Sequence, residues 1–129
     1  MNNLIFQKKI KKLDLNGIFK PTDTTRLLVN ASQQYLKKNQ RVLDLGCGSG
    51  VITYLVYNKK LNQKFFLSDL HSKAIEKSKI NLKKKNISAV FNVGNLYDPW
   101  NNSLPLSKSI YSFFILKASV FLIAVKIIN

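Results

Sequence analysis

The fold is decided by one run of nine residues, Val42-Leu43-Asp44-Leu45-Gly46-Cys47-Gly48-Ser49-Gly50. An apolar segment with one aspartate leads into three glycines at alternate positions, and apolar residues at helical spacing follow from Val51 to Val56. This pattern is typical of a strand that turns through a glycine loop into a helix, because glycine lets the backbone bend tightly and approach a ligand without a Cβ. In an open parallel sheet, nucleotides bind beyond the carboxyl end of such a strand.

Strand and helix patterns alternate on both sides of this loop. Short apolar runs bounded by turn residues predict strands, and apolar residues recurring every three or four positions predict amphipathic helices. Strands are expected at 41–45, 64–67 and 89–93, and helices over about residues 23–37, from 51 to 56 and through 74–82. This order predicts an α/β fold, a Rossmann-like doubly wound parallel sheet with helices on both faces, with about three to five strands.

Composition divides the chain into three parts. Residues 1–20 are expected to be a solvated basic lead-in with a hairpin at Asn16-Gly17, and residues 21–100 to be the ligand-binding core. Residues 101–129 form an apolar tail, and whether it is part of the usual domain stays open. Three interpretations of Ile110–Ile128 stay open: a membrane-spanning helix, a fourth strand with part of a helix, or a segment foreign to the domain. Lys117 near its middle argues against a membrane span.

Charge and cysteine content exclude several classes of protein. The chain has 129 residues with 21 Lys and Arg against 6 Asp and Glu, a formal charge of +15. This excess indicates either a polyanionic partner such as RNA or a compositional drift toward lysine. A single cysteine, Cys47, excludes an internal disulfide, and with a single histidine, His71, no metal site is expected. No apolar stretch near the N-terminus resembles a signal peptide, so a cytoplasmic location is expected.

Two of the six acidic residues fall where strands end. Asp44 lies two residues before Gly46, where a carboxylate would repel a phosphate and suits a positively charged ligand; S-adenosylmethionine carries a sulfonium and an ammonium group and no phosphate. Asp69 ends the second predicted strand, where a carboxylate can accept hydrogen bonds from ribose hydroxyls. Alternatively, Asp69 caps the following helix and the glycines form an ordinary turn. Val51 stands where the nicotinamide fingerprint requires Gly or Ala.

Over about residues 18–100 these motifs resemble the class I S-adenosylmethionine-dependent methyltransferases. The segment Gly17–Thr25 is similar to the one before the glycine motif in the release-factor glutamine methyltransferase and small-domain methyltransferase group. The resemblance implies that Asp44 and the glycine loop hold the methionine end of S-adenosylmethionine, that Asp69 holds the ribose and that the residues Asn95 and Leu96 flank the adenine. The candidate cofactor-binding residues are Asp44, Gly46, Cys47, Gly48, Ser49, Gly50, Asp69, Leu70, Asn95 and Leu96.

The resemblance also implies a reaction, methyl transfer to a nitrogen of a protein glutamine, in a release factor or ribosomal protein, or of RNA. In the resembling group an Asn-Pro-Pro-Tyr segment holds the target nitrogen, but residues 101–106 read Asn-Asn-Ser-Leu-Pro-Leu. No catalytic residue is therefore predicted, and the methyltransferase domain is expected to be incomplete at its C-terminal end. The alternatives are a remnant that binds S-adenosylmethionine without catalysis and a basic RNA-binding module.

Overall fold

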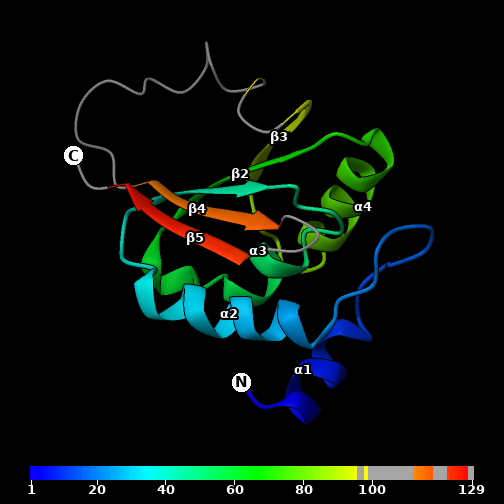
Figure 1. Ribbon diagram of the computed structural model, residues 1–129, viewed down its shortest axis with the longest axis horizontal. Coiled ribbons are helices and arrows are strands. Elements are labelled where there is room, and N and C mark those ends of the chain that lie inside the picture. Colours follow the sequence, from blue (N-terminus) through cyan, green and yellow to red (C-terminus); the bar gives the residue numbers. More distant parts are fainter. Residues whose placement is uncertain (96–97, 99–111, 118–121, 128–129) are drawn as a thin grey trace.

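The computed structural model describes residues 1–95, Asp98, and the segments 112–117 and 122–127. Within these residues a sheet of five strands forms in the order β3-β2-β1-β4-β5, with β5 antiparallel to β4 and the other pairs parallel (Figure 1). The elements are α1 (Asn3–Ile10), α2 (Asp23–Tyr35), β1 (Arg41–Leu45), α3 (Val51–Val56), the 3-10 turn η1 (Lys59–Leu61), β2 (Lys64–Asp69), α4 (Ser72–Lys83), β3 (Ala89–Val93), β4 (Ser112–Lys117) and β5 (Leu122–Ile127).

The predicted α/β fold is confirmed, and the three expected parallel strands are β1, β2 and β3, with β1 in the middle of the sheet and β3 at its edge. The register aligns the carboxyl ends of these strands, since Leu45 of β1 lies beside Ser68 of β2, and Asp69 of β2 lies beside Val93 of β3. Parallel strands that end together leave an edge at which their following loops meet. The glycine loop after β1 therefore lies next to Asp69 and the end of β3.

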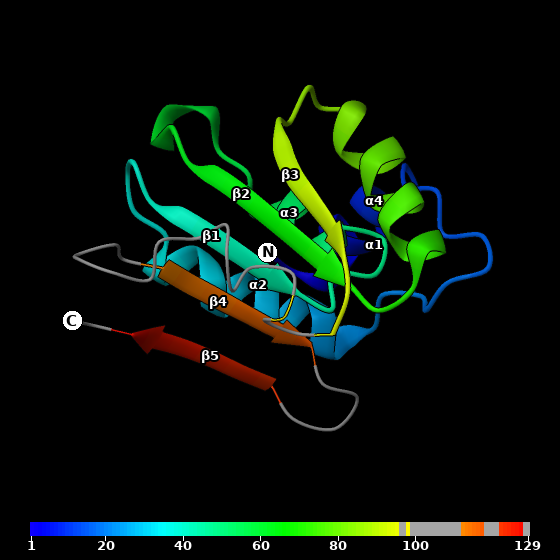
Figure 2. The ribbon, with the colours of Figure 1, turned by 90° about the horizontal axis from the view of Figure 1, so that it is seen from above.

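The helices α1, α2 and α3 lie on one face of the sheet. Figure 1 shows α2 and α3 beneath the strands, and the view in Figure 2 has the strands in front of α1, α2 and α3. The helix α4 packs against β2, β3 and α3. The second helix layer of the predicted doubly wound arrangement is not among the described residues.

Side chains on the helix side of the sheet form the core. Val42 of β1 pairs in register with Phe65 of β2, and all three of Val42, Phe65 and Leu67 are at most 1% exposed. They pack with α2 residues such as Leu28 and α4 residues such as Leu82 in one hydrophobic cluster. Burial of this apolar surface is the main term that stabilises the helix layer on the sheet.

The first twenty residues differ from the prediction. The expected solvated lead-in is wrong, because residues 3–10 form α1 and bury Phe6 and Ile10 in the core. Phe6, Ile10 and Leu13 recur at the spacing of one helix face, and the lysines between them outweighed this signal in the sequence. No strands flank Asn16-Gly17, so the hairpin is also wrong; Gly17 takes a positive φ of 72° in a turn.

The tail contributes two strands. Of the three interpretations left open for this segment, the structure agrees with a fourth strand, β4, which pairs in parallel with β1. The part of a helix that this interpretation placed after the strand is wrong within the described segments, because residues 122–127 form β5 and return antiparallel along β4. In the part of the chain that the structure describes, no helix is both long and apolar enough to cross a membrane.

We predict that Phe6→Ala lowers the free energy of unfolding by about 3–5 kcal/mol, because the ring is fully buried. Leu4→Ala in the same helix is the control, since Leu4 is 80% exposed and its loss should cost about 0.5 kcal/mol or less. Urea denaturation of the two variants measures the difference. Equal losses would show that α1 is not part of the core.

Candidate functional site

The backbone of the glycine loop takes a conformation that few other residues tolerate. Gly46, Gly48 and Gly50 have φ angles of 67°, 55° and 72°, all in the left-handed region. A Cβ at Gly50 would lie 2.8 Å from Leu82 Cδ1 and 3.3 Å from the Ser78 Cα, so Gly50 lets α4 pack closely on the loop. A Cβ at Gly48 would meet no atom of the described residues within 4 Å, so the loop borders open space there.

Two hydrogen bonds join the loop to the end of β2. The Cys47 backbone N–H donates to the Ser68 carbonyl at 3.0 Å, and the Gly48 N–H donates to Asp69 Oδ2 at 2.9 Å. Asp69 Oδ1 accepts a third bond from the His71 N–H at 3.0 Å, just before α4 begins. The Asp69 carboxylate therefore connects the glycine loop to His71, the N-cap residue of α4, and no side chain among the described residues caps the first turn of α4 itself.

Two polar side chains of α4 hold the loop from the other side. The Ser78 hydroxyl donates to the Gly48 carbonyl at 2.7 Å, and the Asn81 amide donates to the Ser49 carbonyl at 3.0 Å. Both side chains are fully buried, and they lie three residues apart on one helix face. Buried polar groups need such partners, so the loop and α4 depend on each other.

Asn81 also binds the segment before α2. Its Oδ1 accepts from the Asp14 N–H at 2.7 Å, and its Nδ2 donates to the Asp14 carbonyl at 3.0 Å. An ion pair of 2.7 Å between Lys77 and Asp14 strengthens the contact, and the hydrogen bond from Lys77 lowers the pKa of Asp14. The N-terminal segment is thus fixed to the same helix that holds the glycine loop.

Asp44 is buried beneath the loop. Its side chain is 0% exposed, and its Oδ2 accepts a hydrogen bond of 2.8 Å from the Thr53 hydroxyl in the first turn of α3. A carboxylate at a helix N-terminus is stabilised by the helix dipole. This partner makes Asp44 a positioning residue for α3; its expected contact with the methionine end of a cofactor stays a prediction.

Cys47 is a buried thiol. It is 3% exposed, and its Sγ lies 3.3 Å from the Ser78 hydroxyl oxygen. Burial raises the pKa of the Cys47 thiol above its ordinary value, and the nearby Asp44 carboxylate raises it further. A thiol in these surroundings stays protonated, which argues against a nucleophilic role for it.

The remaining candidates lie around the open side of the loop. Leu70 is 62% exposed directly after Asp69. The Gly94 N–H donates to the Asp69 carbonyl at 3.0 Å, which brings the exposed Asn95 to the same edge of the sheet. Leu96 lies outside the described residues. Among the described residues no group of three His, Cys, Asp or Glu side chains could hold a metal ion.

Thr53, Asn81 and Asp14 were missed as site residues from the sequence. One signal was present, because Ser78 and Asn81 are polar residues on or beside the apolar face of a helix. A polar residue at such a position needs a buried partner. The sequence did not identify that partner, since it lies about 30 residues away in the glycine loop.

The fold and this site together define an α/β protein whose glycine loop is bonded to a strand-end carboxylate and borders open space at Gly48. A family model for the methyltransferase small domain matches residues 11–105. The chain belongs to this family.

Curated relatives match slightly more than half of the chain. The ribosomal protein L11 methyltransferase of Thermotoga neapolitana is 34% identical over 68 residues, which are 52% of this chain and 25% of that protein. The enzyme of the same name from Dictyoglomus thermophilum is 38% identical over 74 residues, 57% of this chain and 24% of that protein. The chain thus spans about a quarter of the length of these relatives.

Solved structures show the same fold at lower identity. A ribosomal protein L11 methylase from Lactobacillus delbrueckii subsp. bulgaricus has a TM-score of 0.51 at 19% identity, over 59% of this chain and 40% of that one. TrmK of M. capricolum, solved with S-adenosyl-homocysteine, has a TM-score of 0.53 at 15% identity, over 67% and 39%. These likenesses support the Rossmann-like fold.

We predict that alanine at two glycines of the loop lowers the free energy of unfolding by different amounts. Gly50→Ala should lower the free energy of unfolding by about 3 kcal/mol or more, because the methyl group meets Leu82 and the α4 backbone in addition to the backbone strain. Gly48→Ala should cost only the strain of a positive φ, about 1 kcal/mol. Urea denaturation compares them, and equal costs would contradict the open space beside Gly48.

We predict that Cys47 reacts slowly with a disulfide reagent in the native protein at pH 8 and rapidly in urea, because its thiol is buried and protonated. Because the pKa of the Cys47 thiol is higher in the folded than in the unfolded state, ionisation of this thiol at alkaline pH should lower the free energy of unfolding. Cys47→Ala should remove this part of the pH dependence. Thiol titration with time measures the reaction. Rapid labelling without denaturant would contradict the burial.

Proposed function

We propose that this chain binds S-adenosylmethionine in the open space beside Gly48 and Asp69, as the cofactor-binding part of a methyltransferase. The observation that carries this proposal is the loop itself, whose left-handed glycine borders free space and donates its N–H to a strand-end carboxylate at 2.9 Å. Membership of the methyltransferase small domain family supports it.

The residues around this space suit the cofactor. A carboxylate has about four acceptor positions, and the hydrogen bonds that Asp69 accepts from Gly48 and His71 leave acceptor capacity for the hydroxyls of a ribose. Asp44 and Asp69 give this end of the sheet negative charge, which favours a ligand that carries a sulfonium and an ammonium group. Asn95, at the end of β3, lies where an amide could contact an adenine.

The bound cofactor would supply an activated methyl group on a sulfonium. Transfer of that group to a nitrogen needs alignment more than covalent help from the protein. The role of this chain would be to fix the cofactor: Gly48 by close approach, Asp69 by hydrogen bonds to the ribose, and Asp44 by holding the first turn of α3 through Thr53. No residue of the chain is assigned to the chemical step.

The proposed acceptor is a nitrogen on a protein or on RNA. The curated relatives are named for ribosomal protein L11, which makes a ribosomal protein a candidate substrate. Because the chain spans about a quarter of these relatives, their whole activity belongs to the proposal. Incubation with labelled S-adenosylmethionine and ribosomal protein L11 tests it: methylation would support catalysis, and binding of cofactor without transfer would favour a remnant.

We predict that Asp69→Ala weakens S-adenosylmethionine binding by about 1.5–3 kcal/mol, roughly tenfold to a hundredfold, through loss of charge-assisted hydrogen bonds. Asp23→Ala is the matched control, because it also removes a carboxylate but lies on α2 in an ion pair with Arg26. Isothermal titration calorimetry measures both. Unchanged affinity in Asp69→Ala would refute the ribose role.

We predict that Gly48→Ala leaves the chain folded but weakens S-adenosylmethionine binding about tenfold or more, because its methyl group enters the space left for the cofactor. Calorimetry gives the affinity, and the urea midpoint shows that the variant is folded. Full affinity in a folded Gly48→Ala variant would place the cofactor elsewhere.

A further inference from the structure

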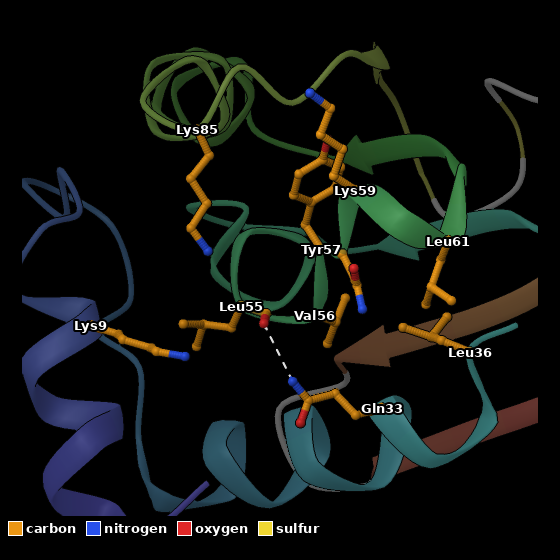
Figure 3. Close-up of a pocket in the computed structure, with 10 residues that line it drawn as sticks. Lys9, Gln33, Leu36, Leu55, Val56, Tyr57, Lys59, Leu61 and Lys85 are labelled. Atoms are coloured by element: carbon orange, nitrogen blue, oxygen red, sulfur yellow. Dashed lines mark hydrogen bonds between the residues drawn. The ribbon is translucent and has the colours of Figure 1, made fainter. Parts of the chain in front are cut away.

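A cavity lies at the opposite end of α3 from the glycine loop. Its volume is about 590 Å³, and it opens where α2 and α3 end, at Leu36 and Tyr57, with η1 and the carboxyl end of α4 beside it (Figure 3). None of the candidate cofactor-binding residues lines it. A cavity of this size falls in the range of sites that bind small molecules or single nucleotides.

The charged residues that line this cavity are all lysines. Lys9 comes from α1, Lys59 from η1 and Lys85 from the turn that follows α4, and Figure 3 shows Lys9 and Lys85 reaching toward the end of α3 from different parts of the chain. None of the six acidic residues of the chain is among the residues that line it. A cavity opening with this charge attracts anions and repels cations.

The basic ends of α1 and α4 lie together. The Lys84 ammonium donates to the Lys12 carbonyl at 2.8 Å, across more than seventy residues of sequence. Burial lowers the pKa of Lys85, and Lys9 and Lys12 lower it further by repulsion between like charges. An anion that bridges these lysines would relieve the repulsion.

Two of the three lysines are suited to bind an external anion. Lys85 already donates to the Tyr54 carbonyl at 2.7 Å and lies over the Tyr54 ring. Lys9 and Lys59 are exposed, and the ion pairs found among the described residues, Arg26 with Asp23 and Lys77 with Asp14, do not include them.

The rest of the lining is apolar, aromatic or neutral and polar. Leu36, Leu55, Leu61 and Tyr57 line the walls of the cavity, together with Gln33 and Asn58. The Gln33 Nε2 donates to the Leu55 carbonyl at 3.5 Å and the Asn58 Oδ1 accepts from the Lys60 N–H at 3.0 Å, so the amide atoms considered for a base are Gln33 Oε1 and Asn58 Nδ2. A phosphate alone would leave these walls uncovered. An unpaired base would cover them, since bases stack on aromatic side chains and pair their edges with amides.

We propose that this cavity binds a nucleotide of a single-stranded RNA, with its phosphates on Lys9 and Lys59 and its base against Tyr57 and the apolar walls. The site would serve RNA recognition at a distance from the glycine loop, since α3 has six residues and spans about 9 Å. The inference does not depend on binding of S-adenosylmethionine, because the two sites share no residue.

The test measures anisotropy of a fluorescein-labelled single-stranded RNA of about 12 nucleotides with the purified chain at several salt concentrations. Lys9→Gln with Lys59→Gln should weaken binding about 25-fold near 0.1 M salt and reduce the salt slope by about 1.4, the values for two lost phosphate contacts. Lys20→Gln with Lys73→Gln removes the same charge from exposed positions outside the cavity and should change affinity far less.

A second variant distinguishes binding of a nucleotide from binding of a phosphate chain without bases. Tyr57→Leu keeps an apolar contact with Phe65 but removes the ring, so RNA affinity should fall about fivefold or more while binding of inorganic polyphosphate stays unchanged. Three results would each overturn the proposal. The two pairs of lysine substitutions could weaken RNA binding equally, or polyphosphate or polyglutamate could compete as well as RNA of the same charge. Tyr57→Leu could also leave the affinity for RNA unchanged. Thermal unfolding of each variant confirms that it is folded.

Discussion

The structure of the site depends on which groups form hydrogen bonds with the backbone of the glycine loop. Three left-handed glycines turn the chain away from regular hydrogen bonding, so the polar groups between them need partners from elsewhere. The N–H groups of Cys47 and Gly48 bind the end of β2, and the carbonyls of Gly48 and Ser49 bind side chains of α4. Because β2 binds the loop on one side and α4 binds it on the other, the loop keeps its conformation beside the open space at Gly48.

The sequence predicted the central fold because its signals there are local. Strands at 41–45 and 89–93 and the helix from residue 23 follow from apolar runs and periodicity, and the structure has them at nearly the same bounds. The N-terminal helix was missed because lysines surround Phe6 and Ile10, although burial of these two side chains decides its position. The second strand of the tail is set by antiparallel pairing with β4, a long-range contact that local pattern does not carry.

The sequence predicted where the site residues lie better than it predicted which atoms their side chains contact. Asp69 and Gly48 are adjacent, as the two strand ends implied, but the direct hydrogen bond between them was not foreseen. Asp44 was expected to face a ligand, and its observed partner is Thr53, nine residues further along the chain. Composition and spacing say which residues come to one edge of a sheet; they do not say which atoms each carboxylate binds, because that depends on side-chain packing around it.

The distribution of charge around α3 connects the two proposed sites. The start of this helix has Asp44 beneath it and Asp69 beside the preceding loop, whereas three lysines and no acidic residue line the cavity at its end. A cofactor with a sulfonium is favoured by carboxylates, and an RNA strand is favoured by lysines. With only six acids in the chain, placing two of them at one end of α3 and none around the cavity at the other separates the two ligands electrostatically. Each end would then repel the ligand proposed for the other, so the charge asymmetry itself would direct a cationic cofactor and a polyanionic partner to different sites.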